Sequence, residues 1–341
     1  MSKKSAQRKH DLTADSAQKE LVKLIQSFSH SHRLHTVFSD FVELSALAIS
    51  NSVDRAQFET REKRYLEIVG KYEREEVERF PQMLGLLVES FEQRVAVVGK
   101  QTSDGLPVSG GLTDVLGETY MMLGLGNDRT GQFFTPFSVS RMMSMMVMGD
   151  VGAEVACRGF IRVNEPACGA GGMVIAAADS LLAAGTNYQQ AMHATCIDID
   201  ACCVHMTYVQ LSLLHVPATV VHGNALSMQV WGTWYTPAHI LGGWTFKLRR
   251  RLEADLLRET VAAERQRVAE VAEMHEIEAE AAFAAEAETS DVAVLERERV
   301  SAAVERSAGD RASLADLFEQ SLASGARERT VFDTIDQLTL F

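Results

Sequence analysis

The sequence predicts an α/β protein with a short parallel sheet, flanked along the chain by two helical segments. Three β-rich runs, at residues 160–163, 194–197 and 219–221, alternate with helix-like stretches. Alternation of this kind is typical of parallel strands joined by crossover helices. After the third run the alternation stops, and no fourth strand is expected. We therefore predict a truncated, three-stranded sheet.

Residues 1–112 are predicted to form a helical N-terminal domain that begins with a basic tail. From residue 16 to about residue 98, apolar side chains recur three and four positions apart, as in Leu21, Leu24 and Phe28. This spacing places them on one face of a helix. Residues 101–111 are rich in glycine and serine, which indicates a connection. Beyond it, Thr113 is expected to cap a further helix.

The sheet domain is expected at residues 113–245, a long charged helix at 246–308 and a C-terminal tail at 309–341. Ala, Glu, Arg, Leu and Val dominate the segment 246–308, and these residues favour helix. Leu257, Val261, Val268 and Val271 fit one seam, but the pattern does not continue as a strict heptad. A solvated charged helix is therefore favoured, and a coiled-coil interface is the alternative.

The composition is that of a globular protein, with 46% apolar residues and a net charge of −13. No apolar stretch approaches the roughly 18 to 20 residues that cross a bilayer, and no signal peptide is recognisable, so a cytoplasmic location is expected. The five cysteines lack CxxC spacing, which argues against disulfides and a zinc site. The acidic balance excludes a chain that grips nucleic acid over its whole surface. The acid is concentrated after residue 245, so a local basic face before it stays compatible with the sequence.

A glycine-rich string, NEPACGAGG at residues 164–172, lies between the first predicted strand and a helix. Glycines at such a bend let the backbone turn sharply and approach a nucleotide-like ligand, where a β-carbon would clash. We call residues 166–172 the glycine loop. Asp198 ends the second predicted strand, where a carboxylate can accept hydrogen bonds from both hydroxyls of a ribose. Asp200 is the competing acid, but its position favours the cap of the next helix.

The string at 164–172, together with GQFFTP at residues 131–136, resembles the adenine-N6 DNA methyltransferases, above all the modification subunits of type I restriction systems. The glycine loop resembles their (D/N)PACGSGG motif, with Glu165 in place of Asp and Ala170 in place of Ser. GQFFTP resembles their GQ(F/Y)(F/Y)TP segment, which wraps the methionine end of the cofactor. The resemblance implies a Rossmann-like fold that binds S-adenosylmethionine and methylates adenine N6 in DNA. It also implies DNA and a specificity or partner subunit as partners.

A third passage, from residue 211 to 226, is similar to the family's NLxLHG…GD(T/S)L passage. Asn224 stands in the place of an Asp that binds the adenine amine of the cofactor, and an amide oxygen can accept the same hydrogen bond. The residues assigned in this way to S-adenosylmethionine are Phe134, Thr135, Pro136, Glu165, Pro166, Ala167, Gly169, Gly171, Asp198 and Asn224.

The family's catalytic tetrapeptide, (N/D)PP(Y/F/W), is absent from the sequence. In the family, its polar side chain and a proline carbonyl accept the amine protons of a flipped adenine, and its aromatic ring stacks on the base. The nearest candidate is WYTPAH at residues 234–239, in which Tyr235, Thr236 and Pro237 would form a divergent clamp. The alternatives are a site completed by a partner chain, or an interaction protein that kept the fold and lost the chemistry. Together these two are slightly favoured over the clamp, although methyltransferase-like remains the best functional description.

The chain ends in QLTLF, which resembles the pentapeptide by which many bacterial replication and repair proteins bind the polymerase sliding clamp. Leu338, Leu340 and Phe341 would be the apolar anchors, and Gln337 would supply an amide contact. The alternative is an apolar end that folds back on the domain, as the helical spacing of apolar residues from 332 to 338 indicates. Clamp binding would explain how an acidic protein is brought to DNA.

Overall fold

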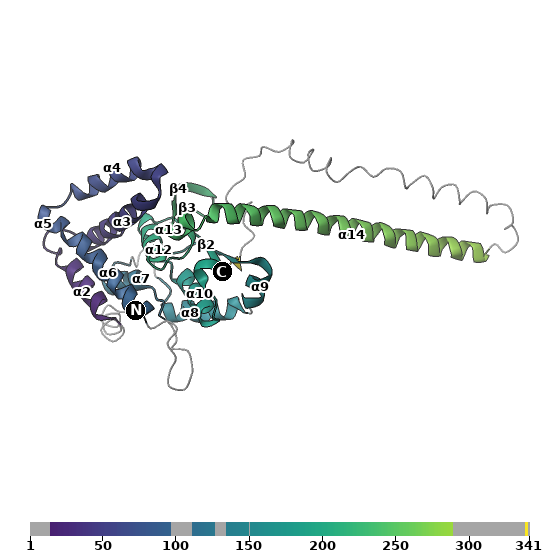
Figure 1. Cartoon of the computed structure of the whole chain (residues 1–341), viewed down its shortest axis with the longest axis horizontal. Helices are drawn as coiled ribbons and strands as arrows, with labels where there is room; N and C mark the ends of the chain where they lie inside the picture. Colours follow the sequence, from purple (N-terminus) through teal and green to yellow (C-terminus); the bar gives the residue numbers. More distant parts are fainter. Residues whose placement is uncertain (1–13, 97–110, 127–133, 150, 289–337, 340–341) are drawn as a thin grey trace, which may run out of the picture. The chain divides into compact units, whose positions relative to one another are not determined.

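The computed structural model describes residues 14–96, 111–126, 134–149, 151–288 and 338–339, which are coloured in Figure 1. The chain divides into two units. Met1–Lys247 and Ile335–Phe341 form the first, and Leu248–Thr334 form the second. The helical and the sheet-forming segments therefore belong to one compact unit. Within the described ranges, no helix is both long enough and apolar enough to cross a bilayer.

Residues 14–96, which we call the helical region, fold into helices as the apolar spacing predicts. Leu21, Ile25 and Phe28 are completely buried, because the three- and four-residue spacing turns all of them toward the core. The elements of the helical region are α2 (Ser16–Gln26), α3 (Leu34–Val53), η1 (Arg55–Gln57), α4 (Phe58–Val69), α5 (Arg74–Val77) and α6 (Arg79–Val95).

Three further helices, α7 (Val115–Met122), α8 (Phe137–Met148) and α9 (Val151–Arg158), precede the sheet. The residue that caps α7 is Asp114 and not Thr113, so that prediction was wrong by one position. The Asp114 carboxylate accepts a hydrogen bond from the Gly117 amide at 2.7 Å. Both residue types favour the cap, and only the backbone conformation decides between neighbours.

A mainly parallel sheet lies at the centre of the first unit and confirms the predicted α/β class (Figure 1). Its strand order is β4-β3-β2-β1-β5. β1 (Ile161–Glu165), β2 (Met192–Asp198) and β3 (Ala218–Asn224) are parallel to one another. β1 and β2 are nearly continuously buried, which is typical of parallel strands, and β3 alternates between buried and half-buried residues. The crossovers carry α10 (Gly172–Ala183), the short α11 (Tyr188–Ala191) and α12 (Ala201–Leu213).

The prediction of three strands was wrong, because a fourth strand, β4 (Gln229–Tyr235), follows β3 directly. It runs antiparallel to β3, from Asn224 opposite Gln229 to Thr219 opposite Tyr235. An antiparallel hairpin needs no crossover helix, so the strand–helix alternation carries no signal for it. The valine and aromatic residues of β4 favour a strand, but it lies at the edge of the sheet and is largely exposed.

At the other edge, β5 (Leu338–Thr339) pairs in parallel with β1. Leu338 is opposite Val163 and Thr339 is opposite Asn164, so this backbone lies on the chain's own sheet. The remaining residues of the predicted clamp-binding pentapeptide lie outside the described residues, and the clamp contact stays a prediction.

The short helix α13 (Pro237–Leu241) leads into α14 (Trp244–Glu288), a helix of 45 residues that confirms the predicted long helix. Positions 289–308 of the predicted helix lie outside the described residues. The four seam residues, Leu257, Val261, Val268 and Val271, are 44% to 61% exposed within this chain. A single chain exposes these residues whether the helix is solvated or pairs with another chain, so both alternatives stay predictions.

Candidate functional site

The glycine loop connects the end of β1 to the start of α10 through two left-handed glycines. Gly169 has φ +53° and Gly171 has φ +89°, a conformation that side chains rarely adopt. A β-carbon on Gly169 would lie 3.0 Å from Cδ1 of Phe134, and one on Gly171 would lie 3.2 Å from Oγ1 of Thr207. Both positions therefore require glycine for their backbone and for the space around them.

Three hydrogen bonds, one to β2 and two from α12, hold the glycine loop. The Cys168 amide donates to the carbonyl oxygen of Ile197 at 2.9 Å. From α12, the Thr207 hydroxyl donates to the carbonyl oxygen of Gly169 at 2.9 Å, and Nε2 of Gln210 donates to that of Ala170 at 2.7 Å. The loop is therefore a shaped, supported segment.

Asp198 lies at the carboxyl end of β2 and points toward the glycine loop. Its Oδ2 accepts a hydrogen bond from the Gly169 amide at 2.8 Å, and its Oδ1 accepts one from the Asp200 amide at 2.9 Å. Burial raises the pKa of the Asp198 carboxyl, and backbone hydrogen bonds partly offset this effect. Asp200 caps α12 by accepting from the Cys202 amide at 2.8 Å, so its predicted capping role is confirmed.

Glu165, the last residue of β1, is the least satisfied charged group of the site. Its side chain is 1% exposed, and its Oε1 accepts a hydrogen bond from the Ala167 amide at 3.3 Å. Its Oε2 is buried and has no hydrogen-bond partner among the described residues. Burial, and then the nearby Asp198 carboxylate, raise the pKa of Glu165 to about 7. A buried polar atom without a partner is costly, which marks this oxygen as a place for a ligand's donor.

The predicted residues of the GQFFTP segment that the structure describes are Phe134, Thr135 and Pro136, just before α8. The Phe134 ring lies against Gly169 and is 5.2 Å from the ring of Tyr120, centroid to centroid. Thr135 and Pro136 are exposed, and Pro136 is the residue before α8. The preceding positions, 131–133, lie outside the described residues. Of this predicted segment, the structure thus places Phe134 on the loop.

Asn224 ends β3, beside the ends of β1 and β2. We call the side of the sheet where the carboxyl ends of these parallel strands meet the carboxyl edge. Its Oδ1 accepts hydrogen bonds from the amides of Leu226 at 3.0 Å and Ser227 at 3.2 Å. The side chain therefore holds the turn between β3 and β4. Glu165, Asp198, Asn224 and the glycine loop are brought together at one edge, as parallel strands require.

The segment that forms the carboxyl edge resembles a known protein family. Residues 113–240 match the family model described as N-6 DNA Methylase. We call this matched stretch, residues 113–240, the N-6 DNA methylase domain after the family model that it resembles. Searches against curated proteins and against solved structures found no match. The matched residues run from Thr113, the residue before the cap of α7, into α13, and include all residues of the glycine loop.

The predicted divergent amine clamp, Tyr235, Thr236 and Pro237, lies at the opposite end of the strands in the N-6 DNA methylase domain. Tyr235 pairs with Thr219 near the start of β3, whereas Asp198 pairs with His222 near its end. The two pairs are three residues apart along β3, which corresponds to roughly 10 Å. We call this opposite end, with Thr219 and Tyr235, the amino edge. The structure does not bring Tyr235, Thr236 and Pro237 to the glycine loop.

Thr236 and Pro237 have structural roles at the amino edge. Thr236 is fully buried; its hydroxyl donates to the carbonyl oxygen of Val216 at 2.9 Å and accepts from the Ala218 amide at 2.9 Å. It also caps α13, in which Pro237 occupies the first turn. Tyr235 is 39% exposed, and its ring centroid is 4.8 Å from that of His239.

Sequence reasoning missed the residues that support the glycine loop from α7 and α12. These are Asp114, Thr207 and Gln210. The available signal was weak. Thr207 and Gln210 are polar residues three positions apart on a mostly apolar helix, which places both on the same face.

Proposed function

We propose that the N-6 DNA methylase domain binds S-adenosylmethionine at the carboxyl edge and, in a complete assembly, methylates adenine N6 in DNA. The observation that carries the proposal is the buried Oε2 of Glu165, which lacks a partner beside the glycine loop. S-adenosylmethionine carries an ammonium group that can donate to this oxygen, and a cation also favours the ionised carboxylate. The family match supports the same reading.

The residues of the carboxyl edge fit this cofactor by their chemistry. Asp198 has carboxylate lone pairs left beyond its two backbone contacts, so it can accept the ribose hydroxyls. The glycines remove β-carbons where the ligand would approach, and Phe134 would cover the methionine end. Pro166 and Ala167 complete the loop. Because the Oδ1 of Asn224 is engaged by the turn, its Nδ2 would be the atom that faces the adenine, as a donor to a ring nitrogen. The cofactor would supply a methyl group on a sulfonium, which is the group that an amine nucleophile needs.

Calorimetric titration of the full chain with S-adenosylmethionine tests the binding half of the proposal. We expect binding by the wild type and a loss of at least about tenfold in Asp198→Ala, because one charged acceptor is removed. Asp200→Asn is the matched control, since asparagine keeps the helix cap two residues away. Absence of binding by the folded wild type would reject the proposal.

A second candidate is a catalytically silent domain that recruits partners. The position of Tyr235, Thr236 and Pro237 at the amino edge, with the Thr236 hydroxyl already engaged, favours it. Transfer of a tritiated methyl group to DNA separates the two candidates. Activity that survives in Tyr235→Ala would place the amine clamp elsewhere. Cofactor binding without transfer by the wild type would favour the silent domain or a partner chain that completes the site.

Recruitment through the sliding clamp belongs to the same second candidate. The proposed contacts are Gln337, Leu338, Leu340 and Phe341. Deleting residues 337–341 should abolish capture of the purified sliding clamp. A full-length chain with Leu338→Ala, Leu340→Ala and Phe341→Ala should lose capture as well, because the apolar anchors are removed at unchanged length. Capture by the shortened chain at the wild-type level would exclude the tail as the binding site.

A further inference from the structure

Gln210 is a buried amide on α12 whose three polar contacts reach two separate parts of the fold. Its Nε2 donates to the carbonyl oxygen of Ala170 in the glycine loop and to Oδ1 of Asp114, both at 2.7 Å. Its Oε1 accepts a hydrogen bond from the Leu116 amide at 3.0 Å. Both amide hydrogens and the oxygen are thus engaged, and they tie the loop to the first turn of α7.

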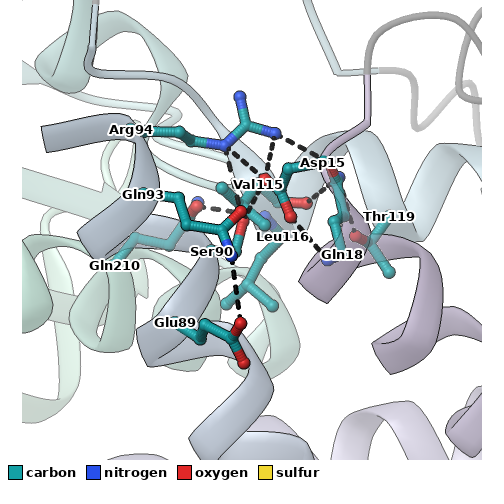
Figure 2. A network of polar contacts seen from close by, with 10 residues as sticks. All are labelled: Asp15, Gln18, Glu89, Ser90, Gln93, Arg94, Val115, Leu116, Thr119 and Gln210. Carbon is teal, nitrogen blue, oxygen red and sulfur yellow. Dashed lines mark hydrogen bonds and ion pairs between the residues drawn. The ribbon is translucent and has the colours of Figure 1, made fainter. Parts of the chain in front are cut away.

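The same turn of α7 is held from its other side by the helical region. Nε2 of Gln18 on α2 lies 3.3 Å from the carbonyl oxygen of Val115 and 3.2 Å from Oγ1 of Thr119, and donates to both. Arg94 on α6 donates to Oε1 of Gln18 at 2.8 Å. Figure 2 shows these side chains converging on α7, with Gln210 nearby on its own helix.

A second contact anchors Arg94 within this network. Its guanidinium pairs with the carboxylate of Asp15, the cap of α2, at 2.9 Å, and Asp15 also accepts from the Ser90 hydroxyl at 2.7 Å. Gln18 and Gln210 are both 0% exposed. Buried polar groups keep their geometry because a lost partner is not replaced by water. The contacts therefore fix α7 between the helical region and the glycine loop.

We propose that Gln210 is a positioning residue for the glycine loop and that Gln18, through α7, belongs to the same support. The helical region then sets how tightly the domain holds S-adenosylmethionine. This inference rests on the proposed function for its binding readout. The carbonyl of Ala170 takes its direction from Gln210, and the place of Gln210 depends on Leu116 and Asp114 at the start of α7.

The test compares full-length Gln210→Leu and Gln18→Leu with Ile68→Val, a control on α4. Ile68 is 0% exposed in the same helical region and has no part in the polar network. At a temperature where all variants are folded, we expect cofactor affinity to fall about tenfold in Gln210→Leu and about fivefold in Gln18→Leu. Affinity should not change in Ile68→Val, even though its melting temperature falls.

Amide hydrogen exchange of Gly169 and Gly171 without cofactor gives a readout that needs no binding. It should be faster in both network variants and unchanged in the control. If the wild type binds no cofactor but the exchange changes as expected, the proposed function fails and the positioning role stands. If the wild type binds and both network variants match it in affinity and in exchange, the inference is overturned.

Thr119→Val provides a milder variant if Gln210→Leu does not fold. It removes one acceptor of Gln18 and leaves the direct contacts of the glycine loop in place. We expect a smaller change of affinity and of exchange, in the same direction. Wild-type behaviour of Thr119→Val together with wild-type behaviour of Gln18→Leu would also overturn the inference.

Discussion

The carboxyl and amino edges of the same sheet both bury polar side chains, but they differ in how completely these are satisfied. At the carboxyl edge, Glu165 keeps a buried oxygen without a partner among the described residues. At the amino edge, Thr236 has its hydroxyl fully engaged, and His193 and His239 form a buried hydrogen bond of 2.8 Å. His239 in turn contacts the Thr245 hydroxyl at 2.9 Å. The unpaired oxygen of Glu165 thus lies at the edge where we propose that the cofactor binds, whereas the contacts of Thr236 and His239 stabilise the fold at the other edge.

The largest effect is expected from Gly171→Val at the carboxyl edge. A β-branched residue at φ +89° is strained, and its β-carbon would press on Thr207. We expect a loss of roughly 1–3 kcal/mol in the free energy of unfolding, measured in urea, and loss of cofactor binding by calorimetry. Gly185→Val is the control, because Gly185 has φ +72° with nothing within 4 Å of the added atom. If the control also lost binding, strain alone would explain the effect and the comparison of the edges would lose its support.

A pH dependence of stability is expected from Glu165, whose pKa is raised from 4.5 to about 7 by burial. The folded chain then holds a proton that the unfolded chain releases between about pH 4.5 and 7. Stability from this group is complete below pH 4.5 and falls as the pH rises through 7, by about 3 kcal/mol at most. Urea unfolding of wild type and Glu165→Gln at several pH values should show the larger decline in the wild type. Asp114 and Asp198 have pKa values shifted in the same direction, so the difference between the two proteins isolates Glu165.

The three parallel strands β1, β2 and β3 and their order along the chain could be predicted from local patterns, but β4 and the long-range contacts could not. The glycine loop, Asp198 and the Asp200 cap follow from the spacing of residues near β1 and β2, because each depends on neighbours in sequence. β4 escaped prediction because a hairpin reverses the chain without a helix, and that reversal carries Tyr235 to the amino edge. Gln210 escaped because its partners at Asp114 and Leu116 lie 96 and 94 residues away.

A moderate effect confined to stability is expected from Thr236→Val at the amino edge. Valine keeps the shape and leaves the buried Ala218 amide without its acceptor, which should cost about 1–2 kcal/mol in the free energy of unfolding. Cofactor affinity should stay at the wild-type level, since no contact of Thr236 reaches the glycine loop. Thr236→Ser retains the hydroxyl and should recover most of the stability. A tenfold loss of affinity in Thr236→Val would show that the amino edge also serves the ligand.

The smallest effect is expected from Tyr235→Phe, which removes one hydroxyl from a side chain that is 39% exposed. Its ring contact with His239 does not need the hydroxyl, so the free energy of unfolding should change by less than about 0.5 kcal/mol. Cofactor affinity should not change either, because Tyr235 pairs with Thr219 at the far end of β3. The variant therefore tests the hydroxyl alone, whereas Tyr235→Ala also removes the ring that would stack on a base. If the wild type transfers methyl groups to DNA and Tyr235→Phe loses that activity at unchanged cofactor affinity, the amino edge takes part in chemistry, and the division of roles between the two edges must be abandoned.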